Sequence, residues 1–248
     1  MRALLGRGLD AELPDPLAPP PGAAPWELAV LALVVGANLG QNRVFPDAWH
    51  LLTGPLLALG AVLLARRSGA SWALLGLSSD RVGTGVRLGA AALGVVAAVV
   101  LAAALVPGLR DAFADDRVVD AATATVLYEA LVRVPIATAL TEEVLFRGVG
   151  HGLLARRFGA GRATLLGAVA FGCWHVLPTL ASARGNAVTE QATGLALVGV
   201  VAGVVLATTV AGLLFTWLRR RSGSVVAPWL AHVGTNSVTL LVALSVAG

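Results

Sequence analysis

The sequence contains no lysine, a single cysteine and few charged residues of any kind. Only 13% of its 248 residues are charged and 57% are hydrophobic, a balance that is too apolar for an ordinary soluble domain. Cys173 alone excludes an internal disulfide bond. All 18 basic residues are arginine, and they form short clusters between apolar runs without a basic face interleaved with aromatic residues. Nucleic acid is therefore not an expected partner.

Seven apolar segments are long enough to cross a bilayer as helices, which takes about 20 predominantly apolar residues. The predicted fold is an all-α, polytopic bundle of about seven transmembrane helices. The spans lie roughly at residues 26–42, 48–65, 86–106, 122–150, 163–181, 194–218 and 224–247. Residues 1–25 contain ELPDPLAPPPGAAP, which is too rich in proline for a helix and is expected to be an extended cytosolic tail.

The distribution of arginine predicts the orientation, because positive charge is retained on the cytoplasmic side of a membrane. With the N-terminus in the cytoplasm, twelve arginines fall in cytoplasmic segments and four in external ones, while Arg133 and Arg147 lie inside a span. We therefore expect an integral membrane protein with its N-terminus in the cytoplasm. The acidic loop is then external, and it contains Asp111, Asp115, Asp116 and Asp120.

The fourth span carries charged side chains that need a partner or a function, because charge inside a bilayer is costly. Glu143 and Arg147 are four residues apart with the acid first, the favoured order for an ion pair on a helix, and Glu129 and Arg133 repeat that spacing. Glu142 has no arginine partner at this spacing. It lies about 100° around the helix from Glu143, so it is expected to point elsewhere, and Pro135 upstream is expected to disturb the helix and admit water.

Two later spans supply polar partners for Glu142. His175 lies in the fifth span, while His232 and Asn236 are four residues apart in the seventh and therefore share one helix face. At about 1.5 Å per residue, Glu142 is roughly 12 Å from the cytoplasmic end of its span, His175 roughly 18 Å and His232 roughly 12 Å. These similar depths predict one shared site in the cytoplasmic half of the membrane.

These residue types predict hydrolysis without a serine or cysteine nucleophile. A carboxylate and an imidazole can hold and deprotonate a water molecule, and a second imidazole with a carboxamide can donate hydrogen bonds to the oxyanion that forms. Alternatively, Glu142, His175 and His232 could bind Zn²⁺, although no HExxH pattern is present. The spacing alone leaves a metal-free site and a zinc site as alternatives.

Three short motifs together carry a family resemblance. EEVLFR at Glu142–Arg147, FGCWH at Phe171–His175 and HVGTN at His232–Asn236 resemble the EExxxR, FxxxH and HxxxN motifs of the CPBP family, the CAAX protease and bacteriocin-processing (Abi) intramembrane proteases. The resemblance covers the chain from about residue 122 and implies that residues 26–248 form a protease domain with its motif-bearing core at about 122–248. The expected substrate is a membrane-associated peptide or lipidated protein, either a prenylated CAAX protein or one related to bacteriocins.

The resemblance also implies a role for each motif residue. Glu142 and His175 would activate water, and His232 and Asn236 would form the oxyanion site. Glu143 and Arg147 would support the site or position the substrate. Members of this family have been described both as metalloproteases and as glutamate-dependent proteases, so the resemblance is compatible with no cofactor or with Zn²⁺.

Two other functions use the same residues. Intramembrane Glu, His and Arg can relay protons in a transporter or channel, although no internal repeat supports that function. A catalytically silent immunity or scaffold protein could also use this fold to bind a partner. Single residues have structural interpretations too: Asn236 can bridge two helices, Phe171 and Trp174 can be packing residues, and His50 and His151, near span ends, are expected to be exposed or interfacial.

Overall fold

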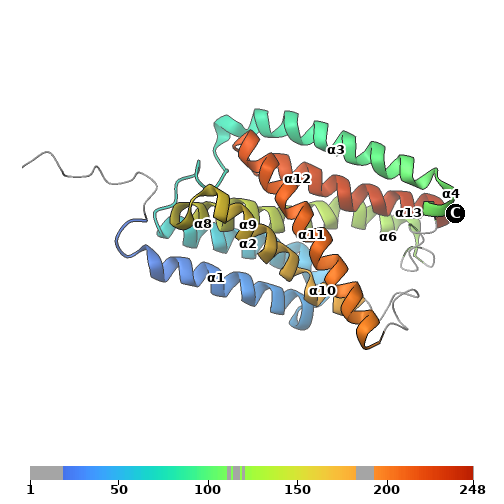
Figure 1. Ribbon diagram of the computed structural model, residues 1–248, viewed down its shortest axis with the longest axis horizontal. Coiled ribbons are helices and arrows are strands. Elements are labelled where there is room, and N and C mark those ends of the chain that lie inside the picture. Colours follow the sequence, from blue (N-terminus) through green and yellow to red (C-terminus); the bar gives the residue numbers. More distant parts are fainter. Residues whose placement is uncertain (1–18, 111–112, 114–117, 119–120, 183–192, 248) are drawn as a thin grey trace, which may run out of the picture.

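The computed structural model describes residues 19–110, 113, 118, 121–182 and 193–247, and these residues form helices and connecting turns without a strand. Seven helical segments among them are long and apolar enough to cross a membrane, which confirms the predicted all-α transmembrane bundle (Figure 1). Most of the predicted Pro-rich tail and the four aspartates of the predicted external loop lie outside the described residues.

The first three spans and their short flanking helices are α1 (Ala23–Leu39), η1 (Gly40–Val44), η2 (Asp47–Trp49), α2 (His50–Arg67), η3 (Ser79–Arg81), α3 (Val82–Ala104) and α4 (Pro107–Arg110). The fourth span is one continuous rod made of α6 (Thr123–Tyr128), η5 (Glu129–Leu140), α7 (Thr141–Glu143), η6 (Val144–Gly150) and α8 (His151–Phe158). The last three spans are α9 (Ala160–Trp174) with α10 (Val176–Ser182), α11 (Leu195–Ser222), and α12 (Val226–Val233) with η7 (Gly234–Val238) and α13 (Thr239–Ala247).

The fourth span is longer than the sequence suggested. Its apolar run was expected to end near residue 150, but the helix continues through the polar segment HGLLARRF and stops at Phe158, before Gly159 with φ of 80°. Positive φ is readily adopted only by glycine, so Gly159 gives the helix a definite end. Glu142 therefore lies about 24 Å from the C-terminal end of this rod at about 1.5 Å per residue, twice the expected distance.

The winding of the fourth span is irregular around the residues expected to carry chemistry. The backbone is π-helical at Glu129–Leu140, which contains Pro135, and again at Val144–Gly150, on either side of the short α7. π-helical segments are rare and are frequently found at functional sites. Trp229 of α12 donates its indole N–H to the Pro135 carbonyl over 2.9 Å. The expected irregularity at Pro135 is thus a wide helical winding tied to α12.

Small residues allow the helices that carry the motifs to approach closely. α9 packs along α11, and a Cβ atom at Gly172 of α9 would lie only 2.7 Å from the Val205 carbonyl oxygen of α11. At the contact between α2 and the fourth span, a Cβ atom at Gly54 would lie 2.7 Å from the Ala137 carbonyl oxygen. These glycines therefore set how near the second and sixth spans come to the site.

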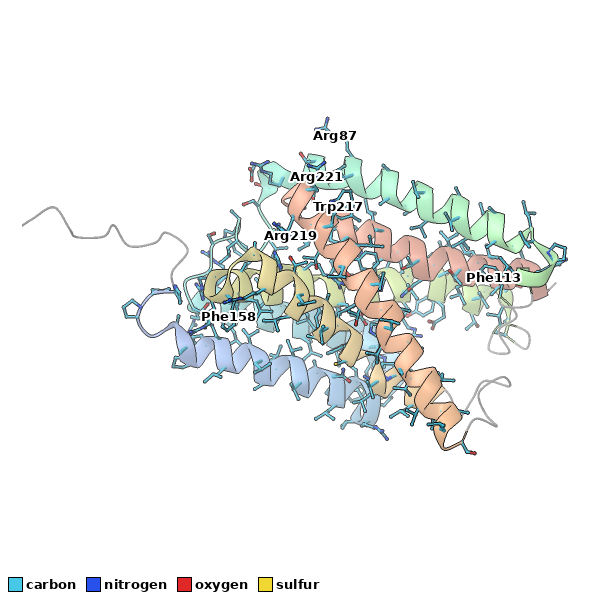
Figure 2. All side chains as sticks on the ribbon, viewed as in Figure 1. Arg87, Phe113, Phe158, Trp217, Arg219 and Arg221 are labelled. Carbon is cyan, nitrogen blue, oxygen red and sulfur yellow. The ribbon has the colours of Figure 1, made fainter. Side chains whose placement is uncertain are left out.

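The arrangement of the spans gathers most of the described arginines at one end of the bundle. The start of α1, the connection between α8 and α9 and the end of α11 lie together at the left of Figure 1, and the C-terminus lies at the opposite end. Figure 2 labels Arg219 and Arg221 in the last turn of α11 and Arg87 in the first half of α3. Apolar side chains cover most of the length between the two ends.

Candidate active site

Glu142 and Glu143 are neighbours in α7 and point in different directions, as the sequence predicted. Both are buried, with 7% and 0% of their surface exposed. Glu143 Oε1 accepts a hydrogen bond from Arg147 Nη1 over 2.8 Å, whereas Glu142 Oε1 accepts one from the indole N–H of Trp174 over 3.1 Å. The predicted Glu143–Arg147 pair is therefore present, and Glu142 is oriented by the FGCWH segment.

His232 joins the two carboxylates to the seventh span. Its Nδ1 lies 2.9 Å from Glu143 Oε1, and its Nε2 lies 3.9 Å from Glu142 Oε2 and 3.2 Å from Asn236 Nδ2. Because Arg147 also binds Glu143, that side chain is assigned as an ionised acceptor and His232 Nδ1 as the donor. In the neutral ring Nε2 then accepts from Asn236, so His232 can donate to an oxyanion only after Nε2 gains a proton.

Aromatic rings hold these polar side chains in place. The Arg147 guanidinium lies over the Phe171 ring at 3.8 Å and near the Phe215 ring at 5.1 Å. The Phe215 ring stacks on His232 with centroids 5.2 Å apart. Cation–π contacts of this kind stabilise a desolvated cation. Phe171 therefore stabilises the charge of Arg147 in addition to packing. Phe215 lies in a long apolar run of α11, and no sequence signal distinguished it.

His175 lies at the C-terminal end of α9, beside this cluster and half-buried. Its Nδ1 is 2.8 Å from the Phe171 carbonyl oxygen. A carbonyl only accepts, so Nδ1 carries the hydrogen and Nε2 of the neutral ring is an acceptor. Phe171 contacts both imidazoles, with ring centroids 4.7 Å from His175 and 6.0 Å from His232. His175 makes no ion pair with Glu142 in the described part of the chain.

The first span also contributes to the site, which the sequence did not predict. Asn38 of α1 donates its side-chain N–H to the Trp174 carbonyl oxygen over 2.9 Å, and Asn42 in turn donates to Asn38 Oδ1 over 3.2 Å. Trp174 is thus bound through its backbone by α1 and through its indole to Glu142. An amide inside an apolar span is costly, and this signal would have identified Asn38.

One remaining candidate, His151, differs from expectation. His151 was expected to be exposed or interfacial, but it is buried, with 7% of its surface exposed. Within residues 19–182 and 193–247, apart from the gaps at 111–120, no group of three His, Cys, Asp or Glu side chains could hold a metal ion. A metal-free site and a zinc site therefore both stay predictions, as in the sequence analysis.

The fourth span supplies the buried acid Glu142 and the Glu143–Arg147 pair, and the seventh supplies His232 and Asn236. The fifth span joins them through Trp174 and Phe171. Residues 124–238 match the family model of type II CAAX prenyl endopeptidase Rce1-like proteins. This match covers a little less than half of the chain and is consistent with the family that the three motifs resemble. It supports a CAAX-type intramembrane protease in general, and the seven apolar helices among the described residues support an integral membrane protein. The match begins at the fourth span, so the first three spans lie outside it. No curated protein and no solved structure matches the chain.

Proposed function

We propose that the protein hydrolyses a peptide bond of a membrane-associated substrate, either a CAAX-type lipidated protein or one related to bacteriocins, with a water molecule activated by Glu142. One observation supports this above the others. Glu142 Oε1 is bound by Trp174, while Oε2 is buried without a hydrogen-bond partner among the described residues and faces His232 Nε2. A carboxylate with one oriented and one uncommitted oxygen can serve as a general base.

In the proposed reaction, Glu142 Oε2 takes a proton from water as the water oxygen forms a bond to the scissile carbonyl carbon. The carbonyl π electrons move to its oxygen, and the Asn236 amide donates to this oxyanion, joined by His232 when Nε2 is protonated. Glu142 then gives its proton to the amide nitrogen as the C–N bond breaks. His175 Nε2 is an acceptor for the second hydrogen of the water.

The proposed location is a bacterial cytoplasmic membrane with the N-terminus and the arginine-rich end in the cytoplasm. Arg66 and Arg67 end α2, Arg156 and Arg157 end α8, and Arg219 lies in the last turn of α11. Positive charge of this kind is retained on the cytoplasmic side. A substrate anchored in the inner leaflet would then approach the site from that side.

The test is cleavage of a prenylated CAAX peptide by the full chain in liposomes. Glu142→Gln keeps the size of the side chain and its hydrogen bond to Trp174 but removes the base, so turnover should fall by about 10²–10⁴-fold. His175→Ala should have a comparable effect. Glu129→Gln is the matched control, because Glu129 is a second glutamate of the same rod and pairs with Arg133; it should keep wild-type turnover.

Several outcomes would overturn the proposal. Undiminished cleavage by Glu142→Gln would remove the base from the mechanism. Proton flux that depends on Glu142, without any peptide cleavage, would favour a transporter, and an immunity phenotype that survives Glu142→Gln would favour a silent scaffold. Cleavage that persists in a chelator, from protein that contains no metal, would support the glutamate mechanism, whereas stoichiometric zinc and loss of activity on chelation would identify a metalloprotease.

A further inference from the structure

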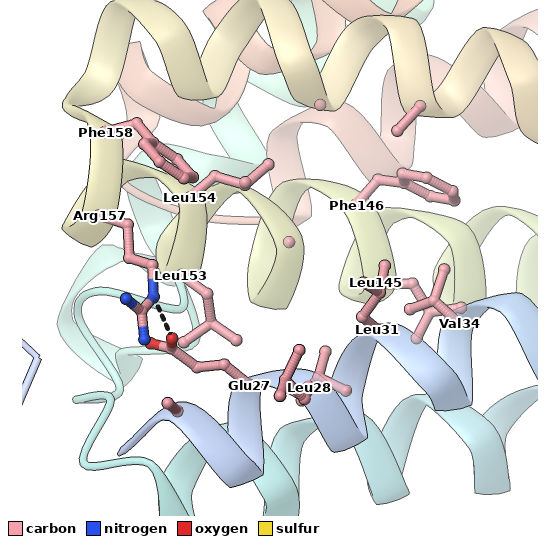
Figure 3. A pocket seen from close by; sticks show the side chains of 15 residues that line it. Glu27, Leu28, Leu31, Val34, Leu145, Phe146, Leu153, Leu154, Arg157 and Phe158 are labelled. Atoms are coloured by element: carbon pink, nitrogen blue, oxygen red, sulfur yellow. Dashed lines mark hydrogen bonds and ion pairs between the residues drawn. The ribbon is translucent and has the colours of Figure 1, made fainter. Parts of the chain in front are cut away.

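A cavity lies beside Phe146, and Glu142 is not among its lining residues. It has a volume of about 540 Å³ and lies between α1, the rod segment η6–α8 and α9 (Figure 3). Its walls are mostly aliphatic and aromatic, and they include Leu31, Leu145, Leu153 and Phe146. This volume falls within the range of about 300–1,000 Å³ that is typical of small-molecule sites.

One end of the cavity carries charge. Glu27 Oε1 is 2.6 Å from Arg156 Nη2, and Glu27 also pairs with Arg157, as Figure 3 shows. The Arg156 side chain is buried, with 3% exposed, and also donates to Ser68. It therefore balances the charge of Glu27. The Arg157 side chain is 40% exposed, which leaves a net positive charge at the end of an apolar cavity.

The rim of the cavity opens toward the lipid-facing surface of the bundle. Leu28 and Leu31 of α1 line it and are 65% and 59% exposed. Charge sits only at the end beside Arg157, where the α8 helix ends. An occupant that fits this pattern has a long apolar chain lying between helices and an anionic group at the level of the arginines. A bilayer phospholipid has this shape and charge.

The inner wall separates the cavity from the reacting groups. The Phe146 ring packs edge-on against Phe171 and Trp174, with centroids 5.2 Å and 5.4 Å apart, and Trp174 holds Glu142. An occupant therefore touches the back of the aromatic wall, away from Glu142 itself. We infer that this cavity binds the acyl chain of an anionic membrane phospholipid, whose phosphate pairs with Arg157.

The experiment is a lipid titration of the full chain in detergent, followed by native mass spectrometry, with phosphatidylglycerol and phosphatidylcholine of the same acyl chains. Gly167→Leu fills the cavity, because Gly167 lines it and a Cβ atom there meets nothing within 4 Å. Gly161→Leu is the matched control in the same helix: its Cβ also meets open space, and it is not a lining residue. Ala170→Leu is a second filling variant if Gly167→Leu fails to fold.

The wild type and Gly161→Leu should bind one phosphatidylglycerol about fivefold more tightly than phosphatidylcholine, because the choline cation offsets the phosphate charge in phosphatidylcholine and one arginine is worth about 1 kcal/mol toward a net anionic headgroup. The filling variants should lose this bound lipid. Arg157→Gln should abolish the preference for the anionic lipid. Arg162→Gln should retain it, because Arg162 is an exposed arginine of α9 that does not line the cavity.

Equal lipid binding by the filling and control variants would overturn the inference, and so would an unchanged headgroup preference in Arg157→Gln. Loss of capture of a lipidated peptide, with phospholipid binding intact, would assign the cavity to the substrate and would also overturn it. Because binding is measured without cleavage, failure of this inference is distinct from failure of the proposed proteolysis.

Discussion

The Glu143–Arg147 ion pair should respond to mutation very differently from Glu129–Arg133, which has the same four-residue spacing in the same rod. The Glu143 side chain is 0% exposed and that of Arg147 is 2% exposed, against 27% and 29% for Glu129 and Arg133. Removing one partner of a buried pair leaves an uncompensated charge and costs about 3–5 kcal/mol. In Glu143→Leu, His232 Nδ1 also loses its acceptor. We therefore expect a loss of at least about 3 kcal/mol.

The expected cost for Glu129→Leu is about 1 kcal/mol or less, because partly exposed pairs contribute little. The double variant Glu143→Leu with Arg147→Met should recover most of the stability lost by Glu143→Leu, since an apolar pair can replace a buried ion pair at little cost. The double variant should nevertheless stay inactive, because His232 has lost the carboxylate that orients it.

The assay is the free energy of unfolding from denaturation in mixed detergent micelles, combined with cleavage of the substrate in liposomes. Strong coupling between Glu143 and Arg147 should appear as a double variant that is far more stable than the sum of the two single changes predicts. Additive losses, or equal losses for Glu143→Leu and Glu129→Leu, would refute the reasoning from burial.

Three further results should follow from particular contacts. Gly172→Ala should cost about 1–3 kcal/mol of stability by overpacking the contact between α9 and α11, whereas Gly167→Ala in the same helix should be neutral or stabilising; thermal unfolding compares the two. Trp174→Phe keeps a ring against Phe146 but removes the hydrogen bond to Glu142, so kcat should fall about tenfold with little change in KM, and an unchanged kcat would contradict this role. Asn38→Leu should raise hydrogen exchange at the end of α9, because the Trp174 carbonyl loses its donor.

The sequence predicted the polar core of the site because membrane spans make polar residues conspicuous. Glu142, His232 and Asn236 stand out in apolar segments, and helix periodicity correctly separated Glu142 from Glu143. Asn38 was missed because amides were weighed only where they accompany a histidine, as Asn236 accompanies His232, although any amide in a span carries the same kind of signal. Phe215 could not be found in this way. It is one aromatic residue in the long apolar segment of α11, and the sequence does not indicate that it contacts an arginine and a histidine.

Span ends were harder to predict than spans. The apolar run of the fourth segment fades near Gly150, but α8 continues because its apolar side chains, such as Leu153, pack into the bundle while its arginines find partners. Tertiary contacts decided that boundary. The π-helical winding around α7 could not be derived either, because Pro135 indicates a disturbance without indicating its form.

The hydrogen bond between Asn38 and Trp174 has a consequence for any attempt to reduce the protein to its signature region. A fragment that begins at the fourth span would retain every motif residue, but Trp174, which orients the proposed catalytic acid, would lose its anchor to the first transmembrane segment. We therefore expect activity to depend on the opening spans, so that exchanging them between relatives should alter it even when the motifs are left untouched.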